Sequence, residues 1–302
     1  MTYDESITLS ARVGQLINSG YTVRYTPAEM KHARAEFSRR ELAELRELGL
    51  YTGDFELFYV IRTFCERSGL GDAAQGDYLA ALFGAARHLD ADEFEHDPYL
   101  TAVRFPEERR GKILLTYAGY ERGELLMYDE PDFSSRLVVP RLGFFSRPVR
   151  FPTVYEGEMP WMSVCPSEIN SMREQMNAAH GRTLVLGLGL GYYPFIVSQR
   201  TAVDRITIVE RNPDVIRLFC EFLLPQFPRR DKIEVVEADA IDYLRNTGES
   251  AFDFCFADIW EGVVDGAPLY LQIRDQAKRL PQTEFTYWLE PQLRAYLGEA
   301  LR

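Results

Sequence analysis

A glycine-rich segment carries the first chemical signal in the sequence, because Gly187, Gly189 and Gly191 alternate with two leucines. This glycine loop (residues 187–191) follows a short apolar run and precedes a segment of helical character. Glycine lets the backbone turn sharply, and it lets a ligand lie against the main chain without meeting a Cβ atom. Three glycines in a tight turn without any ligand are the alternative, and the triplet alone does not decide between the two.

The spacing of these glycines argues against a dinucleotide site. The dinucleotide-binding pattern G-x-G-x-x-G needs a small third residue, where a helix packs closely on a strand and holds a pyrophosphate at its N-terminus. Counting from Gly187 places Tyr192 at that position, and counting from Gly189 places Pro194 there. Neither residue is small, so the pyrophosphate interpretation is disfavoured.

An acidic residue, Glu210, ends the next apolar segment after the glycine loop. A carboxylate in that place can accept hydrogen bonds from both hydroxyls of a ribose. The alternative is a solvated acid or a helix cap. Asn212 stands directly before Pro213 and is the better cap, which leaves Glu210 free for a ligand.

Two further acids follow the later apolar segments. Asp239 either caps a short helix expected over residues 240–244 or binds a ligand, and both roles can coexist because the cap uses one oxygen. Asp258 emerges from an apolar segment, where an acid can orient a substrate or remove a proton. The alternative for Asp258 is a turn residue bonded to nearby amides.

The elements that position these residues alternate between strand and helix, which predicts a parallel sheet covered on both faces. In such sheets, ligands bind at the carboxyl ends of the strands, near the point where the strand order reverses. The glycine loop and all three acids follow strand ends, so they are expected at one edge. The predicted strands cover residues 183–186, 205–210, 233–236 and 252–257, and a helix over residues 167–179 precedes them.

Taken together, residues 166–262 resemble class I S-adenosylmethionine-dependent methyltransferases, whose first motif has the G-x-G-x-G spacing. The resemblance implies an α/β fold with a Rossmann-like, mostly parallel sheet. It implies that the glycine loop passes the methionine part of S-adenosylmethionine. It also implies that Glu210 binds the ribose, that Asp239 accepts the adenine amine, and that Asp258 is the catalytic residue.

The resemblance extends to the spermidine-synthase-like subgroup, in which a β-containing N-terminal region precedes the first motif. Like that subgroup, the chain has no acid two residues before the first glycine, where Val185 stands. Polyamine synthases, however, carry an acid inside the loop, where this chain has Leu190. They also carry a D-x-x-D-P segment, where residues 258–262 read Asp-Ile-Trp-Glu-Gly. These departures argue against aminopropyl transfer.

The predicted function is therefore S-adenosylmethionine-dependent methyl transfer to a small-molecule or peptide acceptor. An aminopropyltransferase stays as an alternative, because Glu261 and Asp265 keep the segment after Asp258 acidic. A non-catalytic protein that binds an adenosine ligand is the other alternative. Resemblance to the polyamine synthases further suggests a homodimer.

The segment after Asp258 is short for this family. It is expected to form a helix over residues 267–279, a strand over 284–289 and a final helix over 291–301. The usual sheet of the family has about seven strands, ending in an antiparallel hairpin. This chain is expected to have about five.

The N-terminal part combines helical and β patterns. Helices are predicted over residues 27–48, 54–68 and 77–88. Residues 100–162 read as a small β region, in which residues 112–117 and 124–128 flank a glycine-containing turn and predict a hairpin. These patterns divide the chain into an N-terminal region, residues 1–162, and a Rossmann-like domain, residues 163–302.

Composition excludes several classes of protein. The 302 residues include 46 acidic and 34 basic side chains, for a formal charge of −12, so general nucleic-acid binding is not expected. The N-terminus is acidic and has no apolar core behind it, so a signal peptide is not expected. The sequence has no uninterrupted apolar run of about 18 residues, so a membrane span is not expected either. A cytoplasmic protein without a metal site is predicted, because the cysteines are few and far apart: Cys65, Cys165, Cys220 and Cys255.

Overall fold

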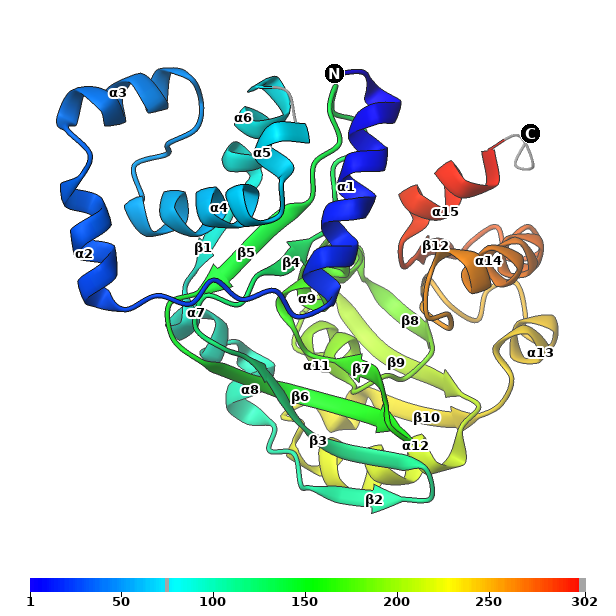
Figure 1. The fold of residues 1–302 in the computed structure, drawn as a ribbon. Helices are drawn as coiled ribbons and strands as arrows, with labels where there is room; N and C mark the ends of the chain where they lie inside the picture. Colours follow the sequence, from blue (N-terminus) through cyan, green and yellow to red (C-terminus); the bar gives the residue numbers. More distant parts are fainter. Residues whose placement is uncertain (74–75, 299–302) are drawn as a thin grey trace. The chain divides into compact units, whose positions relative to one another are not determined.

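The computed structural model describes residues 1–73 and 76–298 and divides into two compact units (Figure 1). The first unit comprises Met1–Glu95 and Gly119–Arg150, and the second comprises His96–Ala118 and Phe151–Arg302. Residues 96–118 and 151–162 thus group with the C-terminal sheet. The predicted division into an N-terminal region, residues 1–162, and a Rossmann-like domain, residues 163–302, stays a prediction.

The second unit contains a five-stranded sheet in which every neighbouring pair is parallel, in the order β10-β9-β8-β11-β12. The chain starts at the centre with β8, builds outward through β9 and β10, and returns to the other side for β11 and β12. The predicted α/β, Rossmann-like fold with about five strands is confirmed. The strands are β8 (Gly181–Leu186), β9 (Val203–Glu210), β10 (Ile233–Glu237), β11 (Phe254–Ala257) and β12 (Glu284–Tyr287).

Helices of this unit precede the first strand of the parallel sheet, connect its successive strands and follow the last one. The helix predicted over residues 167–179 is divided in two at Met172, and the last predicted helix extends partly into residues 299–302, which lie outside the described residues. The helices are α8 (Pro98–Ala102), α9 (Pro166–Ser171), α10 (Arg173–Ala178), α11 (Tyr192–Ser198), α12 (Pro213–Leu218), α13 (Ala240–Arg245), α14 (Val263–Ala277) and α15 (Glu290–Leu297), with short η turns at Phe219–Leu223, Leu224–Gln226 and Arg230–Lys232.

Alternation along the central strands explains how the sheet is covered on both faces. Val185 belongs to one buried cluster, which includes residues of α11 and α12, whereas its neighbours Leu184 and Leu186 belong to another, which includes residues of α13 and α14. Successive side chains of a strand point to opposite faces. The apolar run Leu184–Leu186 at the end of β8 is therefore what a strand buried on both sides requires.

A smaller four-stranded sheet has the order β2-β3-β6-β7. The predicted hairpin of residues 112–117 and 124–128 is wrong, because β3 pairs with β2 and β6, whereas β4 pairs with β5. The two segments are strands, but each finds its partner elsewhere in the chain. The strands of this sheet are β2 (Glu108–Arg110), β3 (Ile113–Tyr120), β6 (Val149–Glu156) and β7 (Met159–Ser163).

The first unit packs helices with a three-stranded sheet in the order β1-β5-β4. The single helix predicted over residues 27–48 is two helices, because Ser38 and Glu41 form a capping box that starts a new one. The helix predicted to reach His88 ends at Ala85. The elements are α1 (Tyr3–Asn18), α2 (Pro27–Ala35), α3 (Arg39–Glu47), α4 (Phe55–Arg67), α5 (Leu70–Ala73), α6 (Gly76–Ala85), α7 (Ala91–Glu95), β1 (Arg87–Leu89), β4 (Leu126–Asp129) and β5 (Arg141–Phe145).

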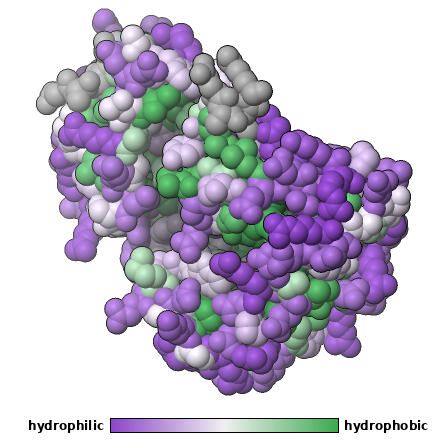
Figure 2. Space-filling view, turned by 90° about the vertical axis from the view of Figure 1, so that its right-hand side faces the viewer, coloured by the Kyte–Doolittle hydropathy of each residue, from purple (hydrophilic) through white to green (hydrophobic). Residues whose placement is uncertain are grey.

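The surface seen in Figure 2 is mainly hydrophilic, as expected for a chain of which 26% of the residues are charged. None of the helices within residues 1–73 and 76–298 has the length and apolar character needed to cross a bilayer.

Candidate functional site

The glycine loop leaves β8 and enters α11, and all three of its glycines have positive φ angles, of +96°, +55° and +76°. A Cβ atom on Gly187 would lie 1.9 Å from the carbonyl oxygen of Asp258, and one on Gly191 would lie 2.4 Å from a ring carbon of Phe219. Both glycines are therefore required by packing within the chain itself.

Gly189 differs from the other two glycines of the loop. The nearest atom to a Cβ built on it is the sulfur of Met162, at 3.4 Å, which is an ordinary van der Waals contact. Its positive φ still favours glycine. Gly189 is the position where the loop leaves room for another molecule to approach the main chain.

The start of α11 is unsuited to a phosphate. Tyr192 is buried and its hydroxyl donates to Asp97, and Pro194 has no amide hydrogen to offer. No small residue stands at either place where a dinucleotide motif would need one. The start of α11 therefore offers few free donors to a phosphate, and the interpretation that disfavours a pyrophosphate stays a prediction.

Sheet register brings three of the predicted site residues into one row, whereas Asp239 lies two residues beyond the register partner of Glu210 on β10. Leu186 of β8 pairs with Val209 of β9 and with Ala257 of β11, so the residues that follow them, Gly187, Glu210 and Asp258, are neighbours across the carboxyl edge. The amide of Asp258 donates to the carbonyl of Leu186 at 2.9 Å. The strand order reverses between β8 and β11, which is where open α/β sheets bind their ligands.

Glu210 is tied to the glycine loop rather than free. One of its oxygens accepts a hydrogen bond from the amide of Leu188 at 3.1 Å, and the other accepts one from the amide of Asn212 at 2.7 Å. Asn212 caps α12, as predicted, and the hydrogen bonds of Glu210 to these two amides were not expected from the sequence. A carboxylate has about four lone-pair positions, so both oxygens keep acceptor capacity for a ligand.

Asp239 caps α13, as its position before residues 240–244 predicts. Its Oδ1 accepts hydrogen bonds from the amides of Ile241 and Asp242 at 2.9 and 3.1 Å. Within the described part of the chain, no partner is recorded for Oδ2, and the residue is exposed. The second oxygen therefore remains available to a ligand, as a shared role requires.

Asp258 is half-buried directly after β11. Burial raises the pKa of its carboxyl group well above the ordinary value, and the negative charge of Glu168 on α9 raises it further. A carboxyl group with a raised pKa exchanges protons closer to neutral pH, which suits a general base. Glu168 is a residue that sequence reasoning missed, because it lies 90 positions upstream.

Helix α8 braces the glycine loop, which the sequence did not indicate. The fully buried Tyr99 donates a hydrogen bond from its hydroxyl to the carbonyl of Leu190, and Asp97 accepts one from Tyr192 at 2.9 Å. Asp97 followed by Pro98 is a recognisable helix start, and Asp97 does cap α8. That signal would have located the helix, but not its contact with a loop about 90 residues away.

Trp260 is a second feature beside Asp258. Its ring is buried, and Gly266 of α14 makes room for it, since a Cβ there would lie 2.7 Å from the indole. The indole Nε1 has no hydrogen-bond partner among the described residues. A buried donor two residues from Asp258 is therefore left unsatisfied within the part of the chain that the structure describes.

No protein-family model and no curated protein matches the sequence. Among solved structures, the precorrin 8W decarboxylase of Methanobacterium thermoautotrophicum is 20% identical, with a TM-score of 0.29 over 39% of this chain and 63% of that one. A conserved hypothetical protein of Streptococcus pyogenes is 18% identical, with a TM-score of 0.27 over 33% of this chain and 60% of that one. The matched region thus spans about three fifths of either structure.

Proposed function

We propose that this chain is an S-adenosylmethionine-dependent methyltransferase that acts on a small-molecule or peptide acceptor. The observation that carries the proposal is the row formed by Gly187, Glu210 and Asp258 at the reversal of strand order. Beside this row, Gly189 leaves main chain open, Glu210 keeps acceptor capacity that ribose hydroxyls could use, and Asp258 is a candidate base. These are the groups that a nucleoside with a reactive tail requires.

The residues at this edge fit S-adenosylmethionine better than a phosphate-bearing nucleotide. Gly189 leaves the loop open to the methionine part, Glu210 keeps acceptor capacity for the ribose hydroxyls, and Oδ2 of Asp239 suits the adenine amine. Pro194 removes an amide from the start of α11, where a pyrophosphate would need one.

The bound cofactor would supply an electrophilic methyl group on its sulfonium. The chain's own contribution is to hold the acceptor in line with that methyl, since positioning supplies much of the rate in group transfer. Asp258 would accept the proton of the acceptor or orient the attacking atom. Its raised pKa means that it takes up a proton more readily than an ordinary aspartate.

Calorimetric titration of the intact protein with S-adenosylmethionine, and separately with NADH, tests the proposal. S-adenosylmethionine is expected to bind with a Kd of about 1–100 µM, in the range of about −8 to −5 kcal/mol, and NADH is expected to bind more weakly. Tighter binding of NADH, or no binding of S-adenosylmethionine at about 1 mM, would overturn the proposal.

Turnover then separates methyl transfer from its alternatives. Transfer of label from methyl-labelled S-adenosylmethionine to a panel of amines, carboxylic acids and peptides supports methyl transfer. Preference for the decarboxylated cofactor together with putrescine would instead favour aminopropyl transfer. Binding without turnover across the panel would favour a non-catalytic adenosine-binding protein.

A further inference from the structure

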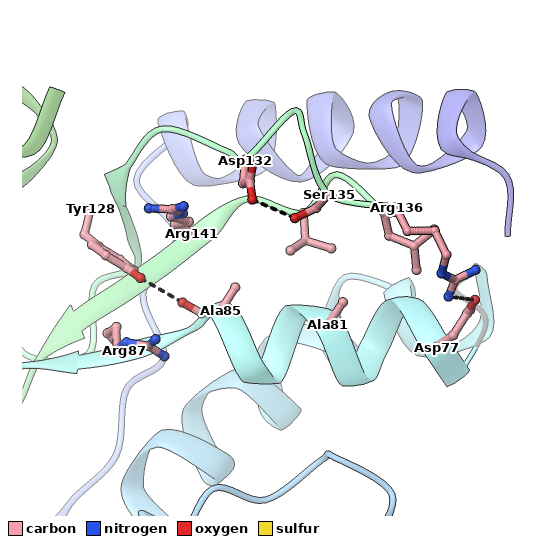
Figure 3. Close-up of a pocket in the computed structure, with 11 residues that line it drawn as sticks. Asp77, Ala81, Ala85, Arg87, Tyr128, Asp132, Ser135, Arg136 and Arg141 are labelled. Carbon is pink, nitrogen blue, oxygen red and sulfur yellow. Dashed lines mark hydrogen bonds and ion pairs between the residues drawn. The ribbon is translucent and has the colours of Figure 1, made fainter. Parts of the chain in front are cut away.

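A cavity of about 480 Å³ lies in the first unit, beside α6 and strands β4 and β5 (Figure 3). Cavities of this size commonly hold small organic molecules. None of its lining residues belongs to the site proposed above. They are Asp77, Ala81, Ala85, Arg87, Tyr128, Asp132, Ser135, Arg136, Leu137, Val139 and Arg141.

Three guanidinium groups line the cavity, and each has donors to spare. Arg87 uses one terminal nitrogen for two carbonyl groups at the end of α6, both at 2.8 Å. Arg141 uses one terminal nitrogen for Asp129 at 2.5 Å, and Arg136 uses one for Asp77 at 2.9 Å. A guanidinium has five N–H donors in a planar fork, so each arginine keeps several for a ligand.

Two of these arginines are held close to the same hydroxyl group. Tyr128 donates from its hydroxyl to the carbonyl of Ala85 at 2.9 Å, and Arg87 and Arg141 lie on either side of it in Figure 3. Burial raises the pKa of the Tyr128 hydroxyl, and the positive charges of Arg87 and Arg141 both oppose that shift. The ion pair with Asp129 fixes Arg141, and the helix end fixes Arg87, so the two forks are in place before any ligand arrives.

Charge and polarity restrict the kind of ligand. The three arginines and the N-terminal ammonium beside Asp77 carry four positive charges. Asp77, Asp132 and the Asp129 paired with Arg141 carry three negative charges, so one net positive charge remains, which a single negative charge would neutralise. A doubly charged phosphate would exceed it. Apolar side chains of Ala81, Leu137 and Val139 complete the lining and suit an uncharged organic body.

We propose that this cavity is a binding site for a small organic monocarboxylate, whose carboxylate is bound by Arg87 and Arg141 beside the Tyr128 hydroxyl and whose apolar body lies against α6 and residues 137–139. Planar guanidinium forks match the two oxygens of a carboxylate, and such paired charged hydrogen bonds give both strength and orientation. The site is independent of the proposed cofactor site, so either proposal can fail without the other.

Titration of the full chain with benzoate, hexanoate and 3-phenylpropionate, followed by calorimetry, tests this site. Each acid is compared with its neutral amide, which has the same shape without the charge. At least one carboxylate is expected to bind about tenfold or more tightly than its amide. Inorganic phosphate is titrated in parallel.

Matched variants locate the binding. Arg87→Gln removes one fork from an exposed residue, and Arg141→Lys keeps the charge beside Asp129 but loses the fork. Each is expected to weaken carboxylate binding about tenfold or more. Arg40→Gln is the control, because this arginine belongs to the same unit, is 89% exposed and lies outside the cavity, and it should leave binding unchanged.

Three results would overturn the proposal. The first is no binding of any of the acids at about 10 mM, a concentration that detects even weak complexes. The second is equal binding of acid and amide, or equal binding by the wild type and by both cavity variants with unchanged melting temperatures. The third is tighter binding of inorganic phosphate than of every carboxylate.

Discussion

Replacing Glu210 by glutamine tests a carboxylate that has both a structural and a proposed ligand-binding role. The substitution keeps the shape but turns one acceptor oxygen into an NH₂ donor, so the hydrogen bond from the amide of either Leu188 or Asn212 is lost. A hydrogen bond to a charged acceptor is worth about 1.5–3 kcal/mol. Glu210 is only half-buried, so we expect the free energy of unfolding to fall by about 1–2 kcal/mol.

The loss of ligand affinity should be larger than the loss of stability suggests. Two ribose hydroxyls would donate to the wild-type carboxylate, one to each oxygen, whereas glutamine offers a single acceptor oxygen, which also accepts from a backbone amide and has room for one hydroxyl. Loss of at least one charged hydrogen bond corresponds to a Kd about ten to a hundred times higher. Affinity and stability therefore have to be measured separately on the same variant.

Calorimetry with S-adenosylhomocysteine, which has no methyl group to transfer, measures the affinity, and urea unfolding measures the stability. Glu237→Gln is the matched control. Glu237 pairs in register with Glu210 at the end of β10, and its substitution removes the same negative charge. The control should change neither quantity appreciably. A Glu210→Gln protein that loses stability but binds normally, or equal loss of affinity in both variants, would refute the reasoning.

The remaining predictions concern protonation and the brace on the loop. Asp258→Asn should abolish the rising limb of the pH–rate profile, because the raised pKa of Asp258 means that its base form appears only well above about pH 4. The wild type should also lose stability relative to this variant as the pH rises from about 4 toward that raised pKa, since the folded protein holds the proton more tightly than the unfolded chain. Tyr99→Phe removes the hydrogen bond to Leu190 and should cost about 1 kcal/mol in urea unfolding, with cofactor affinity several-fold lower and a melting temperature only a few degrees changed. His88→Gln should destabilise the protein more at about pH 5.5 than at about pH 9. The hydrogen bond to Asp54 raises the pKa of His88, so the stabilisation by the charged ring is lost as the pH rises through that raised pKa. An equal difference in urea midpoint between variant and wild type at the two pH values would contradict this.

The sheet of the second unit could be predicted well, because its strands are apolar runs separated by helices with clear starts. The pairing of strands elsewhere could not be predicted. The run at residues 124–128 follows β3 closely along the chain, but β4 pairs with β5, and the turn glycine between the two runs, Gly123, donates its amide to Phe145. Tertiary contacts override a local hairpin pattern when each strand has a better partner.

The candidate site was predictable as a set of positions and not as a set of contacts. Parallel strands end at one edge, so the acids after β9 and β11 had to be neighbours. Which groups they bond follows from the path of the chain between strands. The hydrogen bond between Glu210 and the amide of Leu188 joins residues 22 positions apart. The charge of Glu168 acts on the pKa of Asp258 from 90 positions away, and no local pattern indicates either interaction.

The three glycines of the loop have different structural reasons, and each has to be considered separately before the motif supports a function. Gly187 and Gly191 would be needed in any chain that makes this turn, since a Cβ on either would collide with Asp258 or Phe219. Gly189 alone has space beside it, and a residue such as asparagine could adopt its φ of +55° at modest cost. The case for a ligand thus depends on Gly189 together with Glu210, whose bond to Leu188 holds the loop beside the carboxylate. A loop fixed in this way presents main chain and acid as one preformed surface, which lowers the ordering cost of binding a nucleoside.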